Sequence, residues 1–139
     1  MAVFVFTNAS VKIAPTTGGT EVNLSSYVTS VSLTYEKDSV EITAMGDAGH
    51  RFTGGLQNIS VSLELNNDQA AGSVLETLWS NVGTGTTQLR ISNTTTVGEQ
   101  SFLIVNAFLA ASTPVNGAVG ELSKQSVTFT GGTITKGTV

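Results

Sequence analysis

Cysteine is absent from this chain, and histidine occurs only once, at His50. Without cysteine the protein has no disulfide framework, no thiol catalysis and no zinc site built on thiolates. A metal or acid–base pair would have to join His50 to Asp47, and no acidic cluster or second histidine supports that pair. Serine is common, yet no Gly-x-Ser-x-Gly elbow occurs. We therefore expect a protein that is not an enzyme and needs no cofactor or metal.

Charged residues are scarce, at 12% of the 139 residues, which is about half the usual share. The net charge is −4, and the six Lys and Arg residues are scattered along the chain. No basic cluster offers the surface that phosphate binding requires, so we expect no sequence-specific binding of nucleic acid. Monomeric proteins usually protect their sheet edges with Lys, Pro or other charges. Their shortage here predicts that other subunits cover much of the surface.

Long apolar runs are also missing. No segment reaches the ~18 apolar residues of a membrane span, and Met1–Asn8 has neither a basic region nor a long apolar core. We expect no membrane partner and no signal peptide, and hence synthesis in a cytoplasm.

The chain is instead rich in Ser, Thr and Asn and contains 15 glycines. This composition is typical of a β-rich protein whose exposed strand positions carry small hydroxyl side chains. The clearest strand is Gln57–Leu65, where apolar residues alternate with Ser60, Ser62 and Glu64. An alternating strand around Val31–Tyr35 precedes it, before a polar turn at residues 36–38. Further strands are expected at residues 87–92, 102–110 and 125–130, the last continuing through 133–135. In the strand 102–110 both faces are apolar, with these residues on one of them: Leu103, Val105, Ala107 and Leu109.

One amphipathic helix is expected over about residues 68–82, capped by Asn67 or Asp68. Its apolar stripe runs from Ala71 to Trp79, which places Trp79 in the core. Gly83 is positioned to end the helix in a left-handed conformation. The whole chain, residues 1–139, is read as one domain of antiparallel β-sandwich or half-barrel architecture with this single flanking helix.

Two exposed features suggest contacts between subunits. A connection over about residues 38–55, rich in glycine and irregular from Met45 to Gly55, carries Asp47, His50, Arg51 and Phe52. An aromatic residue in such a connection is unusual unless it docks on something. The second feature is an N-terminal arm of about residues 1–15 with Phe4 and Phe6, although this arm is equally well explained as a strand of the same sheet.

Several segments resemble the small tail tube, or major tail, proteins of long-tailed bacteriophages. They are Val22–Val31, Val40–Asp47 with its Val-Glu-Ile-Thr strand, Arg51–Leu56 with its Gly-Gly-Leu start, and Ser60–Asn66. The resemblance covers about residues 22–82 and, more loosely, residues 117–135. It rests on diffuse β-sheet patterns, and the same fold also serves head-completion and capsid-decorating subunits.

The resemblance implies a virion protein that forms stacked hexameric rings around a DNA channel, assembled in the cytoplasm of a bacterial host. It implies that the connection 38–55 and the arm Val3–Val11 reach other subunits. It also implies a channel lined by hydroxyl-bearing faces that let a polyanion pass without adhesion. The candidate lining residues are Ser60, Ser62, Glu64, Ser126, Thr128 and Thr130.

Two other functions remain open. A capsid decoration or minor head protein on the same fold would sit on the capsid surface and would not polymerise into tubes. A host- or carbohydrate-binding β-sandwich module would need an exposed aromatic platform, and most of the nine aromatic residues fall at core positions.

Overall fold

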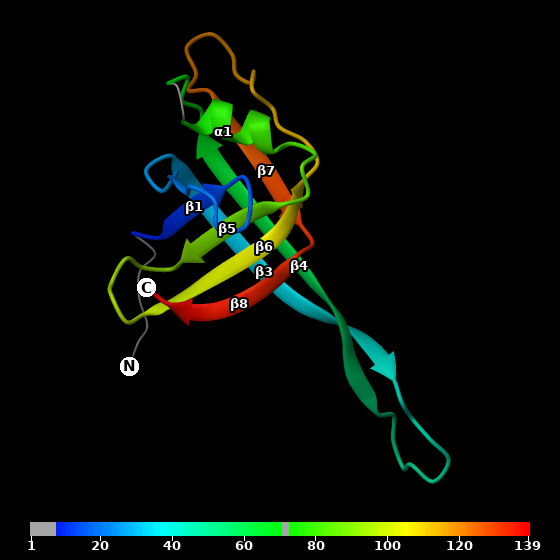
Figure 1. The fold of residues 1–139 in the computed structure, drawn as a ribbon. Coiled ribbons are helices and arrows are strands. Elements are labelled where there is room, and N and C mark those ends of the chain that lie inside the picture. The colour runs from blue at the N-terminus through cyan, green and yellow to red at the C-terminus, as the bar shows by residue number, and fades with distance from the viewer. Residues whose placement is uncertain (1–7, 71–72) are drawn as a thin grey trace.

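The computed structural model describes residues 8–70 and 73–139. Phe4 and Phe6, together with the helix positions Ala71 and Gly72, lie outside these ranges. The described elements are eight strands and one helix (Figure 1): β1 Ser10–Ala14, β2 Val22–Asn23, β3 Val28–Glu41, β4 Phe52–Asn66, α1 Val74–Asn81, β5 Thr87–Ser92, β6 Gln100–Leu109, β7 Lys124–Thr130 and β8 Thr133–Thr138.

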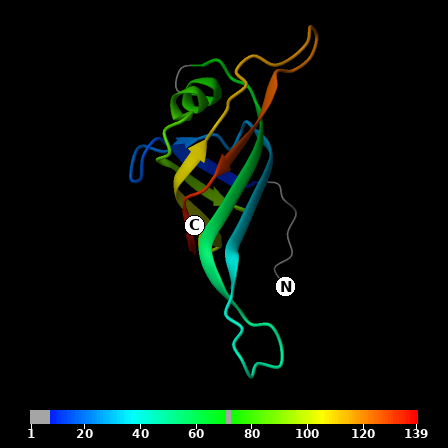
Figure 2. The ribbon, with the colours of Figure 1, turned by 90° about the vertical axis from the view of Figure 1, so that its right-hand side faces the viewer.

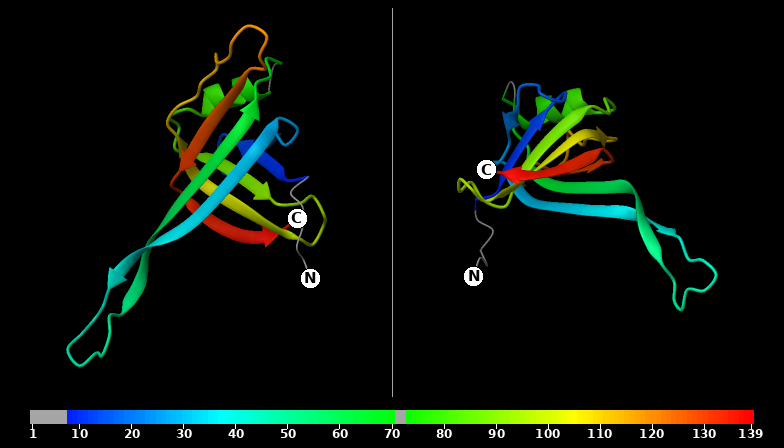
Figure 3. Two further views of the ribbon diagram at one scale, coloured as in Figure 1. Left: turned by 180° about the vertical axis from the view of Figure 1, so that it is seen from behind. Right: turned by 60° about the horizontal axis from the view of Figure 1, so that its bottom comes forward.

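The strands form one antiparallel sheet in the order β2-β1-β5-β6-β7-β4-β3, with β8 paired to β6 beside this path. The sheet curls around a core but does not close, because β3 lies at one end of the order and β2 at the other (Figure 3). The predicted fold class, an antiparallel half-barrel with a single helix, is confirmed. The polar turn expected at residues 36–38 is wrong, since β3 runs through it to Glu41.

Alternation along the strands builds the core. In the second half of β4, from Ile59 to Leu65, the apolar residues at every second position are at most 4% exposed, whereas Ser62 and Glu64 between them face solvent. β7 repeats the pattern with Val127 and Phe129 inside. The core is completed from β1, β5, β6 and α1 by Val11, Ile13, Leu89, Ile91, Ile104, Leu109, Val74 and Leu78.

Strand β6 joins the two parts of the sheet. Its first half, Gln100–Val105, pairs with β8, and its last residues, Phe108 and Leu109, pair with β7. Asn106 lies between these segments with φ of 59°, a left-handed conformation that Asn tolerates better than most residues. The irregularity shifts the alternation by one residue, so that Ile104 shares the core with Ala107 and Leu109. The expected face containing Leu103 and Val105 is therefore wrong for the first half of the strand.

The turn between β7 and β8 fits closely against this irregularity. Gly131 and Gly132 have φ of 77° and 88°. A Cβ on Gly132 would lie 2.2 Å from the carbonyl oxygen of Val105, a distance that no side chain can adopt. Only glycine therefore lets the chain leave β7 and return along β8 at this point.

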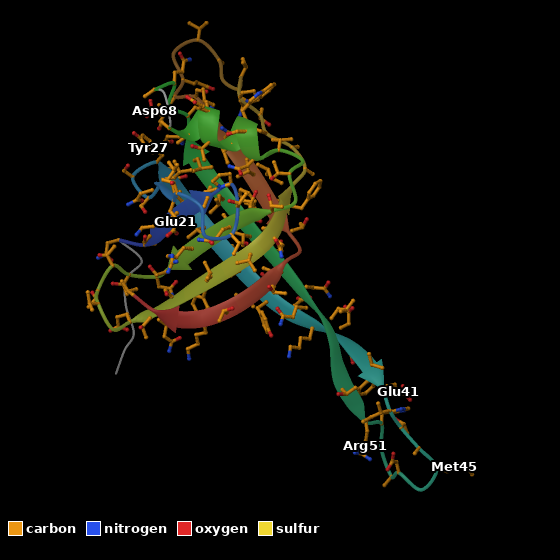
Figure 4. The ribbon with its side chains drawn as sticks, in the orientation of Figure 1. Glu21, Tyr27, Glu41, Met45, Arg51 and Asp68 are labelled. Carbon is orange, nitrogen blue, oxygen red and sulfur yellow. The ribbon has the colours of Figure 1, made fainter. Side chains whose placement is uncertain are left out.

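Helix α1 is shorter than expected, and its N-cap position is Ser73 rather than Asn67 or Asp68, although the Ser73 side chain makes no capping hydrogen bond. The Ser73 hydroxyl donates to the Asp68 carboxylate at 2.7 Å, and this bond is the main reason why the pKa of Asp68 is lowered. The hydroxyl of Tyr27 and the amide of Ala70 add to the effect (Figure 4). Gly83 has the expected positive φ, 79°.

Trp79 is 70% exposed, so the expectation that it lies in the core is wrong. The buried side of α1 contains Val74, Thr77, Leu78 and Asn81. Asn81 is buried because its amide donates to the carbonyl oxygen of Thr77 at 2.7 Å and accepts from the Thr87 hydroxyl at 3.3 Å. These polar residues occupy the inner face and turn Trp79 outward. The helix lies at the end of the molecule away from the tip of the β3–β4 hairpin (Figure 2).

The joint between β6 and the β7–β8 turn generates a stability prediction. In Gly132→Ala the new methyl group meets the Val105 carbonyl, whereas in Gly98→Ala, at φ of 93°, nothing lies within 4 Å of it. Both variants carry the left-handed penalty of about 1 kcal/mol. We expect Gly132→Ala to lose at least about 2 kcal/mol more in free energy of unfolding, because overpacking adds to that penalty. Urea denaturation measures both, and equal losses would contradict the close fit.

Candidate functional site

The β3–β4 hairpin projects well beyond the half-barrel (Figures 1 and 3). Its strands stay paired as far as Glu41 and Phe52, so only residues 42–51 lie outside β3 and β4. The connection expected over 38–55 is therefore largely a β-ribbon, and its irregular part is shorter than Met45–Gly55 suggested. Beyond Asp38 the strand pairs are Ser39 with Gly54, Val40 with Thr53 and Glu41 with Phe52, whereas Gly55 has no partner in the ladder.

A bulge interrupts the ribbon at Asp38, between the pairs made by Lys37 and Ser39. The amide of Asn58 donates to the Asp38 carboxylate there. Gly55 lies opposite, and a Cβ on it would be 3.1 Å from the Cβ of Asp38, so the strands approach more closely than most side chains allow. Bulges bend and twist a strand pair, and this one separates the outer ribbon from the sheet.

The structure brings the four candidate residues of this segment together near the hairpin tip. The Arg51 guanidinium lies 3.7 Å from the Asp47 carboxylate, and His50 Nδ1 lies 3.3 Å from Glu41. The His50 and Phe52 rings are 6.4 Å apart. Asp47 also accepts from the Ala44 amide at 2.8 Å, which closes the turn. Figure 4 shows Glu41, Met45 and Arg51 at this end of the hairpin. Local pairs thus shape the tip, and its role in subunit contact stays a prediction.

Apolar side chains along the ribbon have no cover within the subunit. Met45 is fully exposed, Leu56 is 80% exposed and Phe52 is 58% exposed. Val40 and Ile42, which precede the tip, are each nearly half exposed. A two-stranded ribbon is only marginally stable in water, and exposed apolar patches are common at protein–protein contacts, so these side chains are candidates for such a contact.

A second surface is the outward face of β3, β4 and β7. The predicted residues of β4 and β7 are directly paired: Ser60 with Thr130, Ser62 with Thr128, and Glu64 with Ser126. All are exposed except Ser60, which is half-buried. They form one face because each alternates with a buried apolar neighbour.

This face extends onto β3, although no residue of β3 was among the predicted lining residues. Ser30, Ser32 and Thr34 pair with Glu64, Ser62 and Ser60 in the same register. Their alternation with Val31, Leu33 and Tyr35 could have identified them from the sequence. The hydroxyl face, as we call these nine positions on three strands, contains eight hydroxyl groups and a single charge, that of Glu64, and it is followed at its two ends by Lys124 and Glu36.

Open strand edges are the third feature. Among the described strands, β3 pairs only with β4 and β8 only with β6. Each leaves a row of backbone donors and acceptors available to another strand. β3 contributes fourteen residues, so its edge is the longest one open to pairing.

In the described ranges, no group of three or more His, Asp or Glu side chains is arranged to hold a metal ion. No described helix is long and apolar enough to cross a membrane.

Comparison with solved structures shows which fold this is. A chain of the sheath/tube terminator of an extracellular contractile injection system, the PVC, superposes with a TM-score of 0.69, at 14% identity over 99% of this chain and 98% of that one. A chain of the PVC sheath–tube complex gives 0.65, at 15% identity over 99% and 92%. A chain from the tail of a gene transfer agent, determined with C6 symmetry, gives 0.59, at 13% identity over 92% and 94%. The chain has the tail-tube fold.

The fold that the sequence resemblance implied is therefore confirmed, and it covers almost the whole chain. No family model and no curated protein matches the sequence. At 13–15% identity the likeness lies in the fold and does not extend to particular side chains.

The hairpin tip can be tested separately from the core. Replacing residues 43–50 with Asn-Gly keeps Ile42 and Arg51, whose backbone hydrogen bond of 2.8 Å suits a two-residue turn. Since the removed side chains lie outside the core, we expect the free energy of unfolding to change by less than about 1 kcal/mol. Urea denaturation and circular dichroism provide the measurement. A loss of several kcal/mol would mean that the tip supports the subunit itself.

Proposed function

We propose that this protein is a tail tube subunit of a bacteriophage or related particle, forming stacked hexameric rings around a channel that passes DNA. The observation that carries the proposal is the β3–β4 hairpin. Its outer part, residues 39–56, extends beyond the half-barrel, exposes Met45, Phe52 and Leu56, and contributes no residue to the subunit's own core. A projecting ribbon of this kind is suited to bind the adjacent ring, where its apolar side chains become buried.

In this proposal the hydroxyl face lines the channel. Ser and Thr side chains satisfy their hydrogen bonds with water and present no positive charge to the phosphates of DNA. One carboxylate per subunit, from Glu64, adds a weak repulsion. Since neutralisation of phosphates by Lys and Arg dominates protein–DNA affinity, a face without them lets DNA move without adhering.

The open edge of β3 supports a ring. A strand from the neighbouring subunit can satisfy its free backbone groups, and a closed ring leaves no edge exposed. Six copies are proposed because the gene transfer agent tail that shares the fold was determined with C6 symmetry.

A second candidate function is a tube terminator, favoured by the similarity to the PVC sheath/tube terminator over 98% of that chain. We infer that a terminator would close the end of a tube as a single ring. A tube subunit must instead present compatible surfaces on both sides of its ring.

Electron microscopy of the purified protein distinguishes the two functions. We expect stacked tubes of the unmodified chain, and single rings or free subunits when residues 43–50 are replaced by Asn-Gly, because stacking loses its main contact. Val97→Ser serves as the control, since it removes another exposed apolar side chain from a loop outside the hairpin. Normal tubes from the shortened hairpin would refute its stacking role, and single rings from the unmodified chain would favour a terminator.

The channel assignment has its own test in the same tubes. The chain has no cysteine, so Ser62→Cys and Trp79→Cys can each carry one thiol-specific heavy-atom label. We expect the label at Ser62 to lie at the inner radius of a helical reconstruction and the label at Trp79 further out, because they occupy the hydroxyl face and the exposed side of α1 respectively. The reverse order would contradict the lining role of the hydroxyl face.

A further inference from the structure

The loop between β6 and β7, residues 110–123, exposes a group of apolar side chains. Val119 is fully exposed, Val115 is 92% exposed and Leu122 is 63% exposed. A single exposed apolar residue is normal on a protein surface, whereas several on one loop are typical of a surface that contacts another molecule. We call this segment the β6–β7 loop.

The two ends of the β6–β7 loop are held by a buried polar network. The Ser112 hydroxyl and the Thr113 backbone amide both donate to the side-chain oxygen of Gln125, at 3.1 and 3.2 Å. Gln125, on β7, is 2% exposed, and its side-chain amide donates to the side-chain oxygen of Asn67 at 2.7 Å. Asn67, which follows β4, donates in turn to the Ser123 hydroxyl at 2.7 Å. Since a satisfied polar network rigidifies the chain, the loop is fixed to both strands.

The middle of the loop is held in the same way. The side-chain amide of Asn116 donates to the carbonyl oxygen of Lys124 at 2.8 Å, and the backbone carbonyl of Asn116 accepts from the Ser123 hydroxyl at 2.7 Å. The loop thus directs these polar groups to its own subunit and its exposed valines and leucine to solvent. A surface that is already held in one conformation loses little entropy on binding, which favours association.

The β6–β7 loop and the hairpin tip lie at opposite ends of the molecule (Figures 1 and 2). The loop shares its end with α1, and Figure 4 shows Met45 at the other end. The outer part of the hairpin, residues 39–56, exposes Met45, Phe52 and Leu56. The subunit therefore has two apolar surfaces that differ in their residues. A contact between unlike surfaces joins copies head to tail, whereas a two-fold contact would pair each surface with itself.

We propose that the β6–β7 loop is the surface on which the outer part of the hairpin of a second copy docks. This inference rests on the proposed stacking role of the hairpin and adds the surface that receives it. Docking removes the apolar side chains of both surfaces from water, so each surface supplies the cover that the other lacks within its own subunit.

The charges of the two surfaces permit this contact. Residues 39–56 carry a formal charge of −1, since two carboxylates oppose one arginine, and residues 110–124 carry none, because Lys124 balances Glu121. Each surface thus offers both signs of charge to the other, and neither has an excess that would oppose the contact.

Single cysteines test the contact, because the natural chain contains none. Val119→Cys is mixed as unassembled subunits with Leu56→Cys or with Met45→Cys, and the assembled mixture is treated with a short bis-maleimide. Val97→Cys is the matched control for Val119→Cys, since Val97 is a valine with 86% exposure on the loop between β5 and β6. We expect at least about fivefold more mixed dimer with Val119→Cys for one or both hairpin positions, because docking holds the thiols at a millimolar effective concentration. Mass spectrometry identifies the cross-linked pair.

Equal yields with Val119→Cys and Val97→Cys would overturn the proposal, whether the loop is free or covered by a different protein. Dimers of Leu56→Cys or Met45→Cys with themselves, in excess of the mixed dimers, would overturn it in favour of a two-fold contact between hairpins. Circular dichroism confirms folding, and Val115→Cys replaces Val119→Cys if that variant does not fold.

Electron microscopy of the same mixtures separates this proposal from the tail tube proposal. Tubes that form without the Val119 cross-link leave the tail tube proposal intact and refute the docking surface. Mixed dimers in assemblies that lack six-fold rings have the opposite meaning, because head-to-tail docking then occurs without the proposed tube.

Discussion

Strand β6 holds the two parts of the sheet together, and the backbone at Asn106 makes this possible. One edge of β6 pairs with β5, while the other passes from β8 to β7 at the left-handed residue. Gly132 fits against the Val105 carbonyl at the same point, where no larger residue could lie. The irregularity at Asn106 determines the curvature of the sheet, because a bulge bends the strand. It also determines which residues of β6 face the core, because it shifts every later side chain by one position.

Because the sheet curls without closing, the subunit retains open strand edges and an uncovered apolar groove. The edges of β3 and β8 retain free backbone groups, and an apolar groove lies at the opening. In a monomer such features promote uncontrolled association unless charges or prolines protect them, and this chain has few of either. The low charge of the sequence is consistent with edges that are satisfied by other molecules, or by the chain itself, after assembly.

The two sides of β4 show how one strand serves both stability and the proposed function. Its inner residues belong to the core, and its outer residues form the hydroxyl face with β3 and β7. The same strand then extends past the bulge opposite Asp38 into the hairpin, where no second layer covers it. A change in the outer ribbon should thus affect association before it affects folding, since the two regions share a backbone but few side-chain contacts.

The sequence alone determined the β class, the inner and outer faces of β4 and β7, and a long exposed connection around residues 38–55 that carries an aromatic residue and charged residues. These features depend on alternation and composition, which are local. The tertiary structure decided the rest. Trp79 lies outside because hydrogen bonds to Asn81 make a polar residue acceptable in the core, and no helical periodicity contains that information. The phase of β6 changes at Asn106, and β3 continues through a polar segment, because strands form by pairing with partners that are distant in the chain. The energy of strand pairing depends on residues that are distant in the sequence. A local pattern of residues can therefore indicate that a strand forms, but the paired strand decides where that strand bends or ends.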